Sequence, residues 1–122
     1  MADVSFVLLY VENVAASVAF YAQVFGRPAA EASPNFAMLP AAPGVRLGLW
    51  RRDDVQPAAR TAPGGGELAI TVDSEAAVEA TIARWTELGA RVAQPPTRMD
   101  FGFTAVALDP DGHRLRVFAP AP

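Results

Sequence analysis

The sequence of 122 residues contains no cysteine, no lysine and a single histidine, and these absences exclude several kinds of chemistry. Without cysteine the chain forms neither disulfides nor thiolate metal sites. With one histidine, His113, and no cysteine, neither a zinc cluster nor a catalytic triad is expected. Gly64-Gly-Gly66 is not followed by the Lys-Ser/Thr of a phosphate-binding loop, so it predicts a flexible connection.

Charge and hydropathy exclude two kinds of partner. The ten basic residues are all arginine and form no stripe, and the net charge is −3, so nucleic acid is not an expected partner. The sequence has no run approaching the roughly 18 apolar residues that a membrane span needs. The start, Met-Ala-Asp-Val-Ser-Phe, lacks the basic and then apolar pattern of a secretory signal, so we expect a cytoplasmic protein. A hydrophobic content of 52% supports one folded domain, residues 1–122.

The first half of the chain shows a strand, then a helix, then further strands. The apolar run at residues 4–11 predicts a buried strand, and Asn13 stands where a helix N-cap would. Apolar residues recur at helical spacing up to Gly26, which suits the left-handed residue that ends a helix. Further strands are expected at 36–39 and 46–50, with a weaker one near 28–32.

The same order returns in the second half. Residues 67–72 predict a strand, and Asp73 or Ser74 is expected to cap a helix that Gly89 ends. After a short extended segment at 91–94, residues 103–108 and 113–118 predict a hairpin. Its turn, Asp-Pro-Asp-Gly, has proline second and glycine fourth, as type I turns prefer.

Two local matches indicate that one module is duplicated. Residues 44–50, Gly-Val-Arg-Leu-Gly-Leu-Trp, parallel residues 112–118, Gly-His-Arg-Leu-Arg-Val-Phe, and the two first strands also align. We therefore predict an α+β fold of two tandem β-α-β-β-β modules. The expected boundaries are module 1 at about residues 1–52, a polar and then Pro/Gly-rich linker at about 53–65, and module 2 at about 66–120.

The chain resembles, over nearly its whole length, the vicinal oxygen chelate superfamily, the group of glyoxalases, bleomycin-resistance proteins and extradiol dioxygenases. The Asp109-Pro-Asp-Gly-His113 turn is the most specific of the motifs on which this resemblance rests. The others are Tyr10-Val-Glu-Asn-Val14, Ser17-Val-Ala-Phe-Tyr21, Phe25-Gly26, Gly66-Glu-Leu-Ala-Ile-Thr-Val-Asp73 and Leu88-Gly-Ala-Arg-Val92. The resemblance implies sheets that curl together into a cup-shaped, partly open barrel, in a protein that is commonly a homodimer.

In the family's metal enzymes, His, Gln or Glu side chains on the first and last strands of each module hold a metal ion. The positions that match here are Phe6, Gly48, Glu67 and Arg116. Strand alternation supports this mapping, because it turns the neighbouring aliphatic residues toward the helices and these four toward the cup. Only Glu67 can bind a divalent ion, whereas a catalytic site needs about three protein ligands. The resemblance therefore favours the metal-free, bleomycin-resistance-like branch, without a cofactor.

Aromatic residues are predicted to line a ligand pocket. Trp50 and Phe118 occupy matching positions in the repeat and fall on the cup side, where they would stack on a planar or apolar ligand. The simpler alternative is that they fill the cup as core. The full predicted ligand-binding set is Phe6, Phe36, Met38, Gly48, Trp50, Glu67, Phe101, Phe103, Arg116 and Phe118.

Charged residues on the same side suggest two further features. We expect Glu67 and Arg116 to form a salt bridge in place of the metal, because burying either charge alone is costly. Arg46 and Arg114 also alternate toward the cup. If they point inward they favour an anionic ligand, and otherwise they lie at the surface.

Three functions remain open to the sequence. The favoured one is a non-enzymatic, metal-free, dimeric protein that holds a small aromatic or amphipathic molecule, such as an antibiotic or metabolite. The alternatives are a vicinal-oxygen-chelate enzyme with non-standard ligands, and a structural or regulatory domain whose cup is filled.

Overall fold

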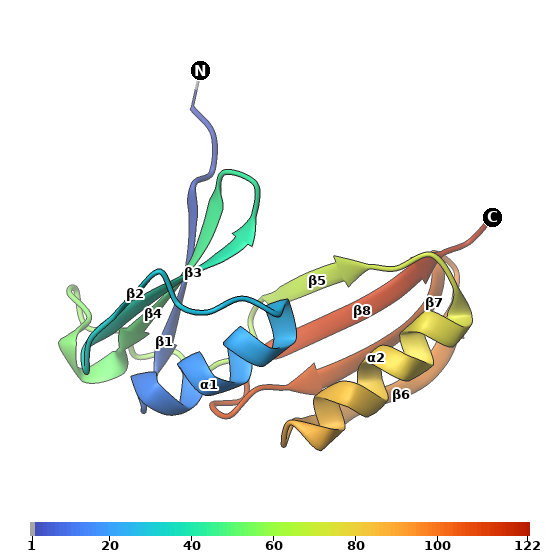
Figure 1. Cartoon of the computed structure of the whole chain (residues 1–122). Coiled ribbons are helices and arrows are strands. Elements are labelled where there is room, and N and C mark those ends of the chain that lie inside the picture. The colour runs from blue at the N-terminus through green and yellow to red at the C-terminus, as the bar shows by residue number, and fades with distance from the viewer. Residues whose placement is uncertain (1) are drawn as a thin grey trace. The chain divides into compact units, whose positions relative to one another are not determined.

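A computed structural model describes residues 2–122 and divides into two compact units, Met1–Thr61 and Ala62–Pro122. Among the described residues, two α-helices and eight strands follow the order β-α-β-β-β twice, and the strands form two four-stranded sheets (Figure 1). The predicted α+β class and the repeated module are confirmed.

Unit 1 contains one sheet and one helix, and its strands are ordered β1-β4-β3-β2. Because β1 runs parallel to β4, the first and last strands of the module are neighbours. A short 3₁₀ turn, Arg52–Asp54, follows the last strand. The elements are β1 (Phe6–Val11), α1 (Val14–Phe25), β2 (Glu31–Ala32), β3 (Phe36–Ala42) and β4 (Val45–Arg51).

Both ends of α1 form as the sequence predicts. The Asn13 side chain accepts a hydrogen bond of 3.0 Å from the amide of Ala16, which satisfies a free donor of the first turn. Gly26 ends the helix in the left-handed region, at a φ of 67°.

Strand alternation separates the two faces of the unit 1 sheet. The face toward α1 carries the core, because Leu47 and Leu49 of β4 and Leu39 of β3 are fully buried together with Val11 and Tyr21. The other face carries larger, partly exposed side chains, among them Phe6 and Leu8. The predicted inward direction of the aliphatic residues on β4 is therefore confirmed.

Unit 2 repeats this plan with strand order β5-β8-β7-β6, and β5 runs parallel to β8. In Figure 1, α2 lies along one face of this sheet, and it contacts β6, β7 and β8. The elements are β5 (Glu67–Thr71), α2 (Glu75–Glu87), β6 (Arg91–Met99), β7 (Gly102–Leu108) and β8 (Arg114–Pro120).

The core of unit 2 lies between α2 and the sheet. Val78, Ile82 and Trp85 of α2 are buried against the sheet, where Leu115 and Val117 of β8 are fully buried. Of the two N-caps that the sequence allowed, the structure uses the hydroxyl of Ser74, which accepts from Ala77 at 3.0 Å. These contacts leave the opposite face of the sheet without a helix of its own unit.

The turn between β7 and β8 has the predicted chemistry. The amide of Gly112 donates to the carbonyl of Asp109 at 3.0 Å. The Asp109 carboxylate accepts from the amides of Asp111 and His113 at 2.8 and 2.9 Å. The side chain thus closes the turn and fixes the start of β8.

One boundary prediction needs correction. The extended segment expected at 91–94 continues as β6 to Met99, and Pro95 and Pro96 are accommodated because β6 is an edge strand with two register shifts. Part of the segment predicted as a linker, 53–65, is packed against unit 1. Val55 is buried, and the Arg52 guanidinium donates to the carbonyl of Thr61 at 2.7 Å.

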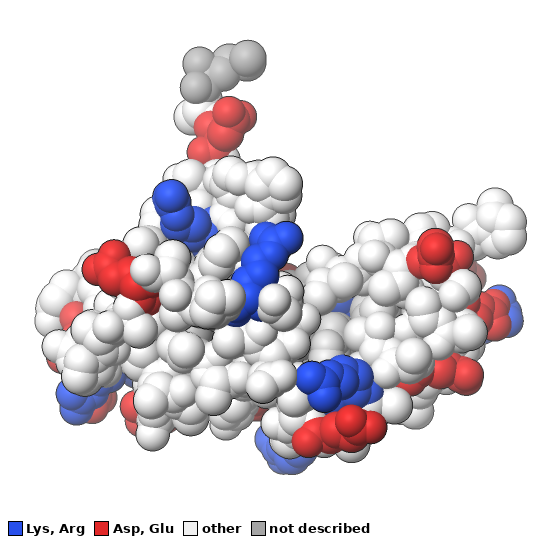
Figure 2. Space-filling view, in the orientation of Figure 1, with Lys and Arg blue, Asp and Glu red and all other residues white. Residues whose placement is uncertain are grey.

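Within residues 2–122, neither helix is long and apolar enough to cross a membrane. On the face seen in Figure 2, acidic and basic groups are scattered among uncharged atoms rather than gathered into a patch of one sign. This distribution agrees with the lack of an arginine stripe in the sequence.

Candidate functional site

The helix-free face of the unit 2 sheet carries an ion pair between β5 and β8. The Nε atom of Arg116 lies 2.5 Å from Oε1 of Glu67, and the second guanidinium nitrogen Nη2 lies 3.4 Å from Oε2. The predicted salt bridge is therefore present, with the two groups facing each other as a bidentate pair. Arg116 is also held by Thr104 at 3.1 Å and by Gln94 at 3.3 Å.

Arg114 brings a second guanidinium to the same carboxylate. Its Nε lies 3.2 Å from Oε2 of Glu67, and this is the charge contact that the sequence prediction missed. This Nε atom is buried, and its contact with the carboxylate is an ion pair rather than a well-formed hydrogen bond. Glu67, Arg114 and Arg116 form what we call the charged cluster, with a net formal charge of +1 from two guanidinium groups and one carboxylate.

The charged cluster changes the acidity of Glu67. The hydrogen bond from Arg116 holds the pKa of the Glu67 carboxyl below its ordinary value, and the nearby charges of Arg116 and Arg114 lower this pKa further. Partial burial of the carboxyl raises the pKa, but its effect is smaller than the sum of the others. The carboxylate is therefore ionised at neutral pH and is a poor general base.

An aromatic pair lies beside the charged cluster. The rings of Phe101 and Phe118 meet edge to face, with centroids 6.0 Å apart, and the Arg116 guanidinium lies 5.9 Å from the Phe101 centroid. Phe101 is 46% exposed, so a large part of its ring is open to a ligand. We call Phe101 and Phe118 the aromatic pair.

Phe103 does not join this pair. It is paired with Ala119, which belongs to the helix-bearing face, and the guanidinium of Arg98 lies 5.6 Å from its ring centroid. Arg98 in turn binds Glu75 of α2 at 2.7 Å. Phe103 is thus on the opposite side of the sheet from the other predicted residues of unit 2.

In unit 1 the matching helix-free face is aromatic and aliphatic instead of charged. Tyr10 and Trp50 meet edge to face at 6.2 Å, and Trp50 is paired with Phe36. A Cβ atom built on Gly48 would lie 2.5 Å from Leu8 and 3.1 Å from Phe36. Gly48 therefore faces this side as predicted, and its missing side chain makes room for two apolar neighbours.

The remaining predicted residues of unit 1 lie on the same face. Met38 is paired with Gly48, and Phe6 is paired with Arg46. The Arg46 guanidinium lies 5.9 Å from the Phe6 ring centroid, and Phe6 is 37% exposed. At the equivalent positions of unit 2, Arg114 contacts a carboxylate, so the repeat has replaced a cation–π contact with an ion pair.

The four positions that match the metal ligands of the resembled enzymes do not fit a divalent ion. Phe6 and Gly48 carry no donor atom, Arg116 is a fixed cation, and both oxygens of Glu67 already face guanidinium groups. Among residues 2–122 there is no group of three His, Asp or Glu side chains that could hold a metal. The donor set of this site therefore disagrees with a metal-dependent mechanism.

We expect purified protein to contain less than about one divalent ion per ten chains, because a single carboxylate ligand binds such ions weakly. Elemental analysis by plasma mass spectrometry after dialysis measures this ratio. Zinc, nickel, iron or manganese present at near one ion per chain, and retained against a chelator, would contradict the expectation.

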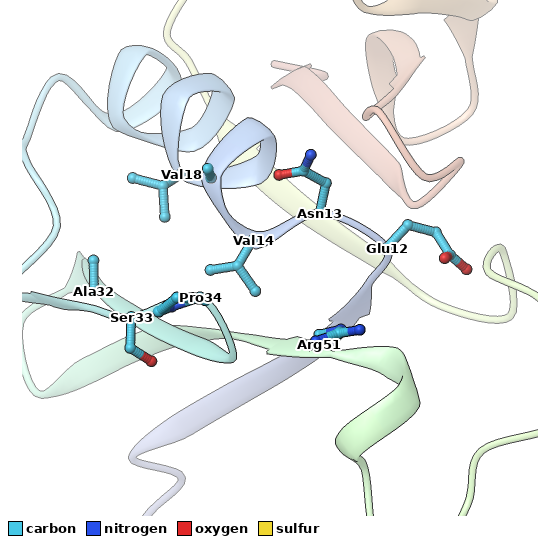
Figure 3. Close-up of a pocket in the computed structure, with 9 residues that line it drawn as sticks. Glu12, Asn13, Val14, Val18, Ala32, Ser33, Pro34 and Arg51 are labelled. Carbon is cyan, nitrogen blue, oxygen red and sulfur yellow. The ribbon is translucent and has the colours of Figure 1, made fainter.

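A separate cavity of about 660 Å³ lies in unit 1, between the start of α1 and the turn that precedes β3 (Figure 3). Val14 and Val18 project from α1 toward Ala32 and Pro34 across it. It was not predicted from the sequence, and it contains none of the predicted site residues. Its lining has no aromatic ring, so it offers a planar molecule no surface for stacking.

The repeated β-α-β-β-β fold and the metal-ligand positions on paired first and last strands define a class of protein. The chain belongs to the Glyoxalase/Bleomycin resistance protein/Dioxygenase superfamily, whose model matches residues 4–117. The resemblance noted from the sequence is thereby confirmed.

Three relatives are informative. The solution structure of protein ATC0852 from Agrobacterium tumefaciens is 45% identical and has a TM-score of 0.91, with 100% of both chains covered. A glyoxalase/bleomycin resistance protein/dioxygenase family enzyme from Burkholderia phytofirmans PsJN is 26% identical, with a TM-score of 0.84 over 98% of this chain and 100% of that one. The phenazine antibiotic resistance protein EhpR of Enterobacter agglomerans is 28% identical over 113 residues, which are 90% of this chain and 86% of that protein.

Proposed function

We propose that this protein binds and sequesters a small planar aromatic compound without the help of a metal ion. The observation that carries the proposal is the aromatic pair beside the charged cluster on the helix-free face of the unit 2 sheet. Phe101, although 46% exposed, is held against Phe118 and Arg116, so its ring is already oriented before a ligand arrives. A preoriented ring binds a planar molecule at little cost in side-chain entropy.

The relative EhpR supports the chemical class of the ligand. Its name states phenazine antibiotic resistance, and phenazines are flat, tricyclic aromatic molecules. Flat rings suit edge-to-face and stacked contacts with phenylalanine. We therefore propose phenazine-like compounds as the class to test first, with the protein acting as a homodimer in the cytoplasm.

Sequestration fits the cluster chemistry better than catalysis does. Glu67, the one carboxylate at a metal-ligand position, is paired with two arginines and has a lowered pKa, so it is poorly suited to remove a proton at neutral pH. A metal-dependent reaction would also need ligands that these positions lack. The proposal therefore assigns the site to binding.

Calorimetric titration with the neutral probe phenazine-1-carboxamide tests the proposal. We expect wild-type protein to bind it and Phe101→Ala to weaken binding about tenfold, or about 1.4 kcal/mol, because one face of the stacking surface is lost. Since Phe101 is half exposed, the substitution should leave the fold intact.

Phe103→Ala is the matched control, because it removes the same side chain two residues away on the opposite face of the sheet. It should change the affinity less than about twofold. If the wild type does not bind the probe, or if both variants lose affinity equally, the proposal is wrong.

A further inference from the structure

On the helix-free face, β8 carries charged side chains at its start and an aromatic side chain near its end. Arg114, Arg116 and Phe118 alternate onto this face, opposite Glu67, Ala69 and Thr71 of β5. At about 3.3 Å per residue, the α-carbons of Arg114 and Phe118 are about 13 Å apart. A ligand that stacks on the aromatic pair and extends along β8 would therefore reach the guanidinium of Arg114.

The charged cluster is not neutral. Glu67 balances one of the two guanidinium groups, and its bidentate contact is made with Arg116, at 2.5 and 3.4 Å. Arg114 approaches the same carboxylate through its buried Nε, at 3.2 Å, while its side chain as a whole is 40% exposed. One positive charge, on a partly exposed side chain, is therefore left at the Arg114 end.

A hollow adjoins this charge. Gly64, Gly65, Gly66, Glu67 and Arg114 line a cavity of about 290 Å³. A Cβ atom added to any of the three glycines would meet no described atom within 4 Å, so the loop leaves open space beside the guanidinium. The hollow is large enough for a carboxylate group, and glycine backbone can approach such a group closely.

From this arrangement we infer that the ligand of the proposed site carries a carboxylate, which Arg114 binds in the hollow formed by Gly64–Gly66. A planar carboxylate matches the planar donor fork of a guanidinium, and such charge-assisted bonds are stronger than neutral ones. The inference rests on the proposed function, because it names the polar end of the same ligand. The aromatic pair holds the ring system, and Arg114 selects for the negative charge.

Two probes of nearly equal shape test the carboxylate preference separately from the proposed binding of the aromatic ring. Phenazine-1-carboxylate and phenazine-1-carboxamide differ by one charge, and both are titrated into wild-type protein, Arg114→Gln and Glu67→Gln at pH 7.5. We expect the wild type to bind the carboxylate about tenfold more tightly than the amide, and Arg114→Gln to lose this preference. Glu67→Gln should strengthen the preference, because the cluster then carries two unbalanced positive charges.

Arg84→Gln is the control for net charge. It removes one positive charge from α2, where Arg84 lies 54% exposed and 4.0 Å from Glu87, away from the sheet face. The carboxylate preference should remain in this variant. Equal binding of both probes by the wild type, or a preference that survives Arg114→Gln, overturns the inference and leaves the proposed function standing. Failure of both probes to bind overturns the proposed function and the inference with it.

Discussion

Replacing Gly102 with alanine is expected to lower the free energy of unfolding by about 3 kcal/mol, combining backbone strain with a steric clash. Gly102 begins β7 at a φ of 145°, a conformation that residues with side chains rarely adopt. A Cβ atom there would lie 2.1 Å from the carbonyl oxygen of Ala119 and 2.9 Å from the amide of Ala121. Both contacts are with backbone atoms, one in β8 and one just after its end, so no side-chain rotation relieves them.

Chemical denaturation of the two proteins measures this loss, and Gly44→Ala provides the comparison. Gly44 also has a positive φ, of 77°, but a Cβ atom there would meet no described atom within 4 Å. Its substitution should cost about 1 kcal/mol, the price of the backbone conformation alone. If Gly102→Ala costs no more than Gly44→Ala, the close approach of β7 and β8 is not as described.

Arg116→Ala is expected to destabilise the fold by about 2 kcal/mol at pH 7, because a mostly buried guanidinium loses three hydrogen-bonding partners. Its side chain is 17% exposed and contacts Glu67, Gln94 and Thr104. The loss is moderate because Arg114 stays 3.2 Å from the Glu67 carboxylate and still compensates its charge. Adding Glu67→Gln to Arg116→Ala should recover part of the loss, since the carboxylate is then gone.

Arg98→Ala is the control for this experiment. Arg98 makes a short ion pair of 2.7 Å with Glu75, but the two side chains are 69% and 50% exposed. Its removal should change the stability by less than about 1 kcal/mol, as for other surface ion pairs. A larger effect for Arg98→Ala than for Arg116→Ala would contradict the view that the charged cluster contributes more than a surface pair.

The effect of Arg116→Ala should also depend on pH. Because the pKa of Glu67 is lowered in the folded state, the ion pair contributes fully above the ordinary carboxyl pKa of about 4.3. Its contribution is lost as the pH falls through the lower folded-state pKa. Denaturation curves should therefore show a smaller difference between wild type and Arg116→Ala at pH 3 than at pH 7.

Much of the fold was predictable because local chemistry and tertiary structure agree. Asn13, Gly26 and the Asp109 turn each determine their own backbone through short-range hydrogen bonds or a positive φ, and all three act as predicted. The extent of β6 was not predictable in the same way. Its two prolines weaken the strand pattern, and the pairing with β7 resumes beyond them at Thr97 after a register shift.

The candidate site shows where simple alternation fails. Phe101 and Phe103 are two residues apart and would share a face in a regular strand. Phe101, however, lies in the turn between β6 and β7, and β7 begins only at Gly102, whose φ is 145°, so the two rings lie on opposite sides of the sheet. The position of Arg114 beside Glu67 was overlooked for another reason, since strand ends are usually solvated and the sequence alone does not reveal the register of β5 and β8.

The paired positions of Leu8 on β1 and Gly48 on β4 affect how substitutions at these two sites combine. In unit 1, Leu8 occupies the space that Gly48 leaves, whereas in unit 2 Ala69 makes room for Arg116 at the equivalent pair. A histidine or glutamate introduced at Gly48 would require the side chains of Leu8 and Phe36 to move, because its Cβ would lie 2.5 Å from Leu8 and 3.1 Å from Phe36. A smaller residue in place of Leu8 would open this space, so a larger side chain at position 48 would then be accommodated at a lower cost in stability. The effects of substitutions at positions 8 and 48 on stability are therefore expected to be non-additive.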